Sequence, residues 1–125
     1  MPGKRPTSAD ASVERPWGSW HVLDSGDGYK VKRIEVLPGH RLSYQTHEQR
    51  SEHWLVVSGV ATCVIDGRTV MVRPGEHLDV DCGSAHRIGN DQDTLLVVVE
   101  VQRGDYTGED DIVRLDDDYD RYEVL

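Results

Sequence analysis

The chain of 125 residues has no phenylalanine, two cysteines and no long apolar run. A helix that crosses a bilayer needs about 20 consecutive apolar residues, so no membrane span and no membrane partner are expected. The first twelve residues, MPGKRPTSADAS, lack the apolar segment of a secretory signal. Cys63 and Cys82 cannot form a disulfide framework and are expected to be small packing residues in a cytoplasmic protein.

Positive charge is also scarce: the chain has 14 basic and 23 acidic residues, which gives a net charge of −9. A strongly acidic chain without a basic stripe is not expected to bind nucleic acid. The length suits one domain with one core. We expect a flexible N-terminal arm over residues 1–14 and a folded domain over residues 15–125, whose C-terminal extension is acidic.

Helical periodicity is absent before residue 108, and short apolar segments alternate with turns rich in Gly and Asp. Strands are predicted over 19–23, 29–37, 52–57, 60–65, 68–72, 77–80 and 94–101. Asp66-Gly67 between two such segments is a strong hairpin signal. Residues 109–115 suit either a short helix or a strand. The pattern predicts an all-β antiparallel sandwich or barrel.

Candidate metal donors gather in the stretch from Gly39 to Gly59. Gln45 and His47 are two residues apart, so on an extended strand they project from the same face. Glu52 stands at the head of the next apolar strand. A hairpin that folds residues 45–47 against 52–54 would bring an amide oxygen, an imidazole and a carboxylate together.

The spacing of these donors resembles the first motif of the cupin superfamily, and a second stretch resembles the second motif. The first motif is matched by Gly39, Gln45, His47, Glu52 and Gly59, and the second by Gly75, Gly83, His86 and Asn90. Two positions depart from the usual pattern, Gln45 in place of His and Asp81 in place of Pro. The resemblance implies a single-domain cupin jelly roll in which His86, delivered by a loop, is the fourth ligand. It also implies a homodimer, because cupins commonly pair through their sheet edges.

The four donors Gln45, His47, Glu52 and His86 supply two nitrogens and two oxygens. Such a set suits a divalent ion of zinc, cobalt, manganese, nickel or iron, and spacing does not choose among them. His47, His86 and Glu52 alone also match the facial triad of iron oxygenases. The remaining alternative is that the ligand set has decayed and the barrel binds no metal.

A longer resemblance runs from residue 15 to the C-terminus, to the C-terminal isomerase domain of type II phosphomannose isomerase. Its most specific pieces are Gln45–Trp54, QTHEQRSEHW, and Gly108–Arg114, GEDDIVR. The resemblance implies that the same four donors bind the metal and that Arg50 lies beside the substrate. No Gly-rich phosphate loop occurs, so the nucleotidyltransferase half of that family is not expected here.

Candidate catalytic residues are Lys32, Arg50 and His53. Lys32 shares a strand face with Ile34, so it is expected either to point into the cavity or to snorkel at the rim. Ammonium and guanidinium groups match phosphoryl oxygens, which makes Lys32 and Arg50 candidates for phosphate binding. The sequence leaves two candidates for the catalytic base. One is His53, although it alternates with Glu52 and so faces away from the metal on an unbulged strand, and the other is a carboxylate from the C-terminal stretch.

That stretch contributes Glu109, Asp111 and Arg114 as further candidates. The alternative interpretation is that they are ordinary charged residues on the surface.

The sequence favours a metal-dependent isomerase that interconverts mannose 6-phosphate and fructose 6-phosphate, in carbohydrate metabolism and polysaccharide biosynthesis. A cupin that binds a sugar or another small molecule without turnover is the alternative, and a cupin oxygenase is the third hypothesis.

Overall fold

The computed structural model describes residues 12–119. Residues 1–11 of the expected N-terminal arm, and the acidic extension from residue 120 on, lie outside this range. Residues 12–14 begin the first strand, β1. No helix within residues 12–119 is long and apolar enough to span a membrane.

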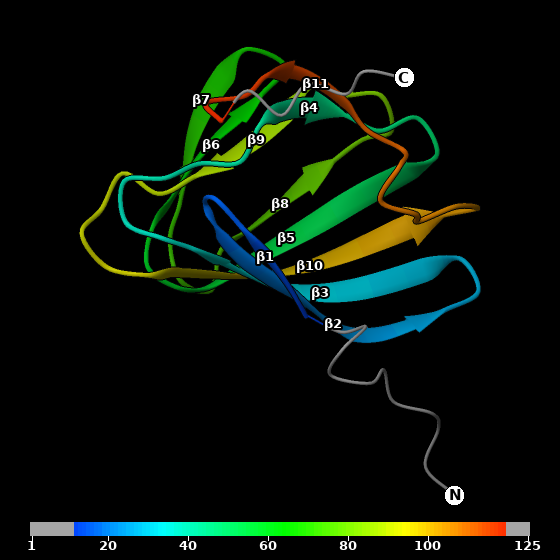
Figure 1. The fold of residues 1–125 in the computed structure, drawn as a ribbon, viewed down its shortest axis with the longest axis horizontal. Helices are drawn as coiled ribbons and strands as arrows, with labels where there is room; N and C mark the ends of the chain where they lie inside the picture. Colours follow the sequence, from blue (N-terminus) through cyan, green and yellow to red (C-terminus); the bar gives the residue numbers. More distant parts are fainter. Residues whose placement is uncertain (1–11, 120–125) are drawn as a thin grey trace, which may run out of the picture.

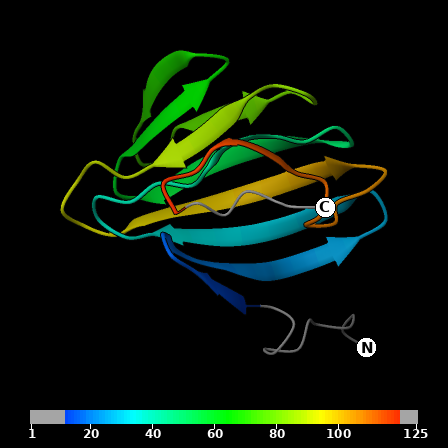
Figure 2. The same cartoon turned by 45° about the horizontal axis from the view of Figure 1, so that its top comes forward.

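Residues 12–119 form eleven strands in two antiparallel sheets. The two sheets face each other (Figures 1 and 2). The six-stranded sheet contains, in spatial order, β1 (Ser12–Arg15), β2 (Gly18–Gly26), β3 (Tyr29–Val36), β10 (Leu96–Gly104), β5 (Arg50–Ser58) and β8 (His77–Val80). The five-stranded sheet contains β11 (Val113–Asp116), β4 (Tyr44–Thr46), β9 (His86–Gly89), β6 (Ala61–Ile65) and β7 (Arg68–Val72). The all-β architecture predicted from the sequence is confirmed.

The core lies between the two sheets, where alternate residues of each strand point inward. Ile34, Val36 and Lys32 of β3 are all buried, so the predicted face of this strand is confirmed. β10 lies between β3 and β5 and buries Leu96 and Val98 completely or nearly so. The position of β10 explains its aliphatic sequence, because both of its edges and one of its faces are covered.

The turn between β6 and β7 is the predicted hairpin at Asp66-Gly67. Both residues have positive φ, 47° and 82°, as the tight two-residue turn requires. The two cysteines differ from each other: Cys63 of β6 is buried, and burial raises the pKa of its thiol to about 12. Cys82 is exposed, so its expected packing role is wrong.

The first metal-donor stretch does not fold as the predicted hairpin. β4 pairs with β9 and β11 in one sheet, whereas β5 pairs with β10 and β8 in the other. The chain therefore crosses between the sheets after residue 46, and its donors meet across the interior. The loop over residues 81–85 delivers His86, as expected, and His86 is the first residue of β9.

Gly59, at the end of β5, is a position where only glycine fits. Its φ is +80°, and an added Cβ would lie 2.8 Å from the carbonyl oxygen of Leu95. We expect Gly59→Ala to lower the free energy of unfolding by more than about 1 kcal/mol, measured by urea denaturation. Gly75→Ala is the matched control, because Gly75 has a similar φ of +84° but no atom within 4 Å of the added Cβ. Equal losses in the two variants would show that the contact with Leu95 contributes nothing.

Candidate metal centre and pocket

Three candidate ligands converge in the interior: His47, Glu52 and His86. Their ligand atoms lie within 4.8 Å of one another, and all three side chains are buried. The distances are 3.2 Å from His47 Nε2 to Glu52 Oε2 and 3.7 Å from His86 Nε2 to Glu52 Oε1. The predicted convergence of two distant segments is therefore confirmed for these residues.

Backbone carbonyls fix the orientation of both imidazoles. His47 Nδ1 donates to the carbonyl oxygen of Asp111 at 2.6 Å, and His86 Nδ1 donates to that of Ser84 at 2.9 Å. Each ring therefore carries its proton on Nδ1 and presents the lone pair of Nε2 to Glu52. A carbonyl behind each ring is the arrangement that holds metal-binding histidines in the required tautomer.

Burial keeps the two histidines neutral. It lowers the pKa of His47 to about 4, with the positive charge of Arg50 as the second cause. Burial also lowers the pKa of His86. Both neutral imidazoles present Nε2 lone pairs near Glu52: that of His47 accepts a hydrogen bond from Arg50, whereas His86 Nε2 has no hydrogen-bond partner in the described part of the chain. A buried acceptor without a donor is costly, so the cluster fits a bound cation.

Gln45 lies on β4, next to the strand that carries His86. It is opposite His86 in the β4–β9 pairing, it is 9% exposed, and it lines the same pocket as His47 and Glu52. Gln45 and His47 therefore share an inward face, as their spacing predicted. The role of Gln45 as a ligand stays a prediction.

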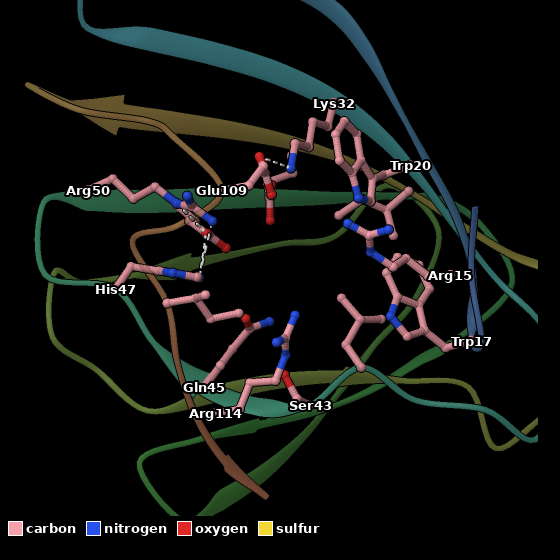
Figure 3. A pocket seen from close by; sticks show the side chains of 15 residues that line it. Arg15, Trp17, Trp20, Lys32, Ser43, Gln45, His47, Arg50, Glu109 and Arg114 are labelled. Carbon is pink, nitrogen blue, oxygen red and sulfur yellow. Dashed lines mark hydrogen bonds and ion pairs between the residues drawn. The ribbon is translucent and has the colours of Figure 1, made fainter. Parts of the chain in front are cut away.

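Arg50 is buried beside the cluster and bridges two of its members. Its Nε donates to Glu52 Oε2 at 2.9 Å and its Nη2 donates to His47 Nε2 at 3.2 Å (Figure 3). The guanidinium thus neutralises Glu52 on the side of His47. Because it also lines the pocket, it is available to an anionic ligand.

Glu100 is a buried residue that the sequence analysis missed. It accepts hydrogen bonds from Gln102 Nε2 at 2.7 Å and from Trp54 Nε1 at 3.2 Å. Burial and the nearby charge of Glu52 raise its pKa to about 7. The available signal is that Glu100 is the one acidic residue inside the aliphatic run of residues 94–101, a run that otherwise predicts an ordinary core strand.

A pocket of about 620 Å³, mouth included, opens next to the cluster (Figure 3). Lys32 is only 4% exposed and lines the pocket. Of the two predicted positions for its side chain, inside the cavity and at the rim, the first is therefore the one observed. The Nζ of Lys32 is 2.6 Å from Glu109 Oε2 and 3.9 Å from the centroid of the Trp20 ring. The basic side chains that line the pocket are Arg15, Lys32, Arg50 and Arg114.

The C-terminal stretch folds over this pocket, which corrects its interpretation as plain surface charge. In Figure 1 the segment after β10 passes from the six-stranded sheet to β11 in the other sheet. Glu109 and Arg114 line the pocket. The carboxylate of Asp111 accepts hydrogen bonds from the backbone NH groups of Glu48 and Gln49. The stretch therefore closes one wall of the site and orients His47.

His53, a candidate base, is not brought to the pocket. It follows Glu52 on β5, so it points out of the opposite face of the sheet, where its Nδ1 lies 2.5 Å from Asp79 Oδ1. The strand is not bulged at this position, because residues 50–56 pair continuously with β10. Strand alternation therefore separates His53 from the buried cluster.

Comparison with known proteins agrees with this architecture. The family model described as "Mannose-6-phosphate isomerase C-terminal" matches residues 3–117. The alginate biosynthesis protein AlgA of Pseudomonas aeruginosa is 44% identical over 119 residues, which are 95% of this chain and 25% of that protein. A mannose-1-phosphate guanylyltransferase of Escherichia coli is 41% identical over 119 residues, again 95% and 25%.

Among solved structures, a sugar phosphate isomerase of the cupin superfamily from Silicibacter pomeroyi superposes with a TM-score of 0.60 and 20% identity. The superposition covers 67% of this chain and 59% of that one. It supports the cupin fold. The chain spans about a quarter of the length of the curated relatives it matches.

Proposed function

The chain belongs to the mannose-6-phosphate isomerase C-terminal family, and on that basis we propose that it is a metal-dependent isomerase of mannose 6-phosphate and fructose 6-phosphate. The observation that carries the proposal is one pocket that joins a buried His–Glu–His cluster to several basic side chains. The cluster suits a divalent ion, and the basic side chains suit a phosphate. The solved cupin from Silicibacter pomeroyi, itself described as a sugar phosphate isomerase, is consistent with this chemistry.

His47, Glu52 and His86 would hold the ion, with Gln45 as the fourth donor. Their fit rests on the Nε2 lone pairs that face Glu52 and on the missing partner of His86 Nε2. The bound ion supplies Lewis-acid stabilisation of the negative charge that develops on the substrate oxygens during enolisation. Spacing and geometry leave the identity of the ion open among zinc, cobalt, manganese, nickel and iron.

We assign phosphate binding to Lys32 and Arg50. Both are nearly inaccessible to solvent yet line the pocket, so their charges act in a poorly hydrated environment. Lys32 is paired with Glu109, whose side chain is 41% exposed. An incoming phosphate can take over this pairing while Glu109 turns toward solvent or toward the substrate carbons.

We assign the proton transfer to Glu109 in place of His53. Partial desolvation in the pocket disfavours its ionisation, but the charge of Lys32 and the hydrogen bond from it outweigh this effect and hold the pKa of Glu109 below its usual range. Its carboxylate removes the proton from C2 of the aldose while the C1 carbonyl oxygen gains a proton from solvent, which gives the enediol, and Glu109 then returns its proton to C1. The O2 hydroxyl releases its proton to solvent as the ketose carbonyl forms, so the proton gained at O1 equals the proton lost at O2.

Binding of a sugar phosphate without turnover is the second candidate. Lys32 and Arg50 already have carboxylate partners in the protein, so the pocket is electrostatically satisfied without a substrate. The same residues would then hold the ligand, and no proton would move.

A coupled assay for fructose 6-phosphate tests the two candidates. We expect the protein, incubated with mannose 6-phosphate and each of the five divalent ions in turn, to form fructose 6-phosphate. Glu109→Gln should lower kcat while leaving KM nearly unchanged, because an amide keeps the shape and cannot accept the proton. Binding of mannose 6-phosphate without product, with every ion, would select the binding module. Coupled oxygen consumption with iron would instead support the oxygenase.

A further inference from the structure

A second group of metal-binding side chains lies on the outer face of the six-stranded sheet. His53, His77 and Asp79 have ligand atoms within 4.8 Å of one another. They come from β5 and from β8, which lies at the edge of the sheet and, among the strands of residues 12–119, pairs with β5 alone. The group is independent of the proposed function, because Glu52 and His53 point to opposite faces of β5.

Strand geometry brings the three side chains together. His53 is directly opposite Asp79 in the β5–β8 pairing, and His77 is two residues before Asp79 on the same face of β8. The rings of His53 and His77 have centroids 5.0 Å apart. Positions on paired strands are held by the backbone ladder, so the separation of the three donors is set by the sheet and not by a mobile loop.

The charge around the group favours a cation. The carboxylate of Asp79 lies against the His53 ring, with 2.5 Å between Oδ1 and Nδ1. Asp79 lies beside His53 in a surface hollow that Asp81 and one basic residue, Arg103, also line, so acidic residues outnumber basic ones there. The chain as a whole carries a net charge of −9. Two imidazoles and one carboxylate are ligands that zinc and neighbouring transition ions accept, with water in the remaining positions.

We propose that His53, His77 and Asp79 form a surface site for a divalent transition ion, which links the edge strand β8 to β5. β8 has four residues and one neighbour in the sheet, so it depends on few backbone hydrogen bonds. An ion held from both strands adds a cross-link at this edge. Ion binding should therefore slow the opening of β8 as well as fill the site.

Zinc binding to the metal-free protein tests the proposal. By equilibrium dialysis with elemental analysis, we expect His77→Ala and Asp79→Asn each to bind one equivalent less than the unchanged protein. His21→Ala is the control. His21 is a partly exposed histidine of the same sheet, its Nε2 is 3.6 Å from Glu35 Oε2, and it belongs to neither group of three candidate ligands among the described residues. This variant should bind as much zinc as the unchanged protein.

Hydrogen exchange provides the second measurement. Zinc should slow amide exchange over residues 77–80 in the unchanged protein and in His47→Ala, but not in His77→Ala. His47→Ala separates this site from the buried cluster, so a failure of the isomerase proposal leaves the result intact. Full zinc stoichiometry in His77→Ala and Asp79→Asn, or exchange of β8 that zinc does not change, would overturn the proposal. Because both side chains point outward, loss of folding is not expected, and circular dichroism checks this.

Discussion

Replacing His47 with alanine is expected to remove the divalent ion from the buried cluster and to lower isomerase turnover by more than about 100-fold. The substitution deletes one of the three side chains that converge there. Loss of an outer-shell partner alone typically costs 10–100-fold in metal affinity or activity, and loss of a ligand costs more. Elemental analysis after dialysis measures the first effect, and the coupled assay measures the second.

The remaining donors cannot compensate for this loss. Glu52 would keep its hydrogen bonds from Arg50 and Trp54, and His86 would keep its own carbonyl partner, so the fold of the pocket should persist. His21→Ala serves as the control, since this residue lies on β2, away from the buried cluster, and hydrogen-bonds to Ser12 and Ser19. Metal content and turnover in His47→Ala equal to those of the control would contradict the assignment.

Replacing Trp54 with alanine is expected to lower the free energy of unfolding by about 3–5 kcal/mol. Trp54 is 2% exposed and packs in the core beside Val56 and Ile88. Its Nε1 also donates to Glu52 Oε1 at 2.9 Å and to Glu100 Oε2 at 3.2 Å. The alanine variant therefore creates a cavity and leaves two buried carboxylates without this donor. Urea denaturation followed by circular dichroism measures the change.

Two further variants separate the causes. Trp54→Phe keeps most of the ring volume and loses only the NH donor, so its loss should be smaller, about 1–3 kcal/mol. Leu55→Ala changes the next residue of β5, which is 39% exposed on the outer face, and should stay within about 0.5 kcal/mol of the unchanged protein. A loss in Trp54→Ala no larger than that in Leu55→Ala would show that this part of the core is not tightly packed.

Short-range features of the fold were predictable because their causes are local. The inward face shared by Lys32 and Ile34 follows from strand alternation, and the Asp66-Gly67 turn follows from the φ values that these residues tolerate. The same alternation indicated that Gln45 and His47 share a face. The motif spacing placed His86 in the cluster, although the residues around it give no strong strand signal.

Long-range features were not predictable in the same way. Local alternation does not tell which sheet a strand joins, so β4 and β5 were paired wrongly although their donors do meet. Glu100 was missed because an aliphatic run predicts burial and does not reveal what an acidic member of the run faces. The contact between Asp111 and His47 joins residues 64 positions apart, and no local pattern reports such a contact.

That last contact has a consequence for the order in which the protein matures. The carbonyl that orients the His47 ring belongs to a residue near the C-terminal end of the matched family region. During synthesis from the N-terminus, both sheets can acquire most of their strands before Asp111 leaves the ribosome. The orientation of the His47 ring is therefore expected to be fixed only after most strands of this domain have been synthesised.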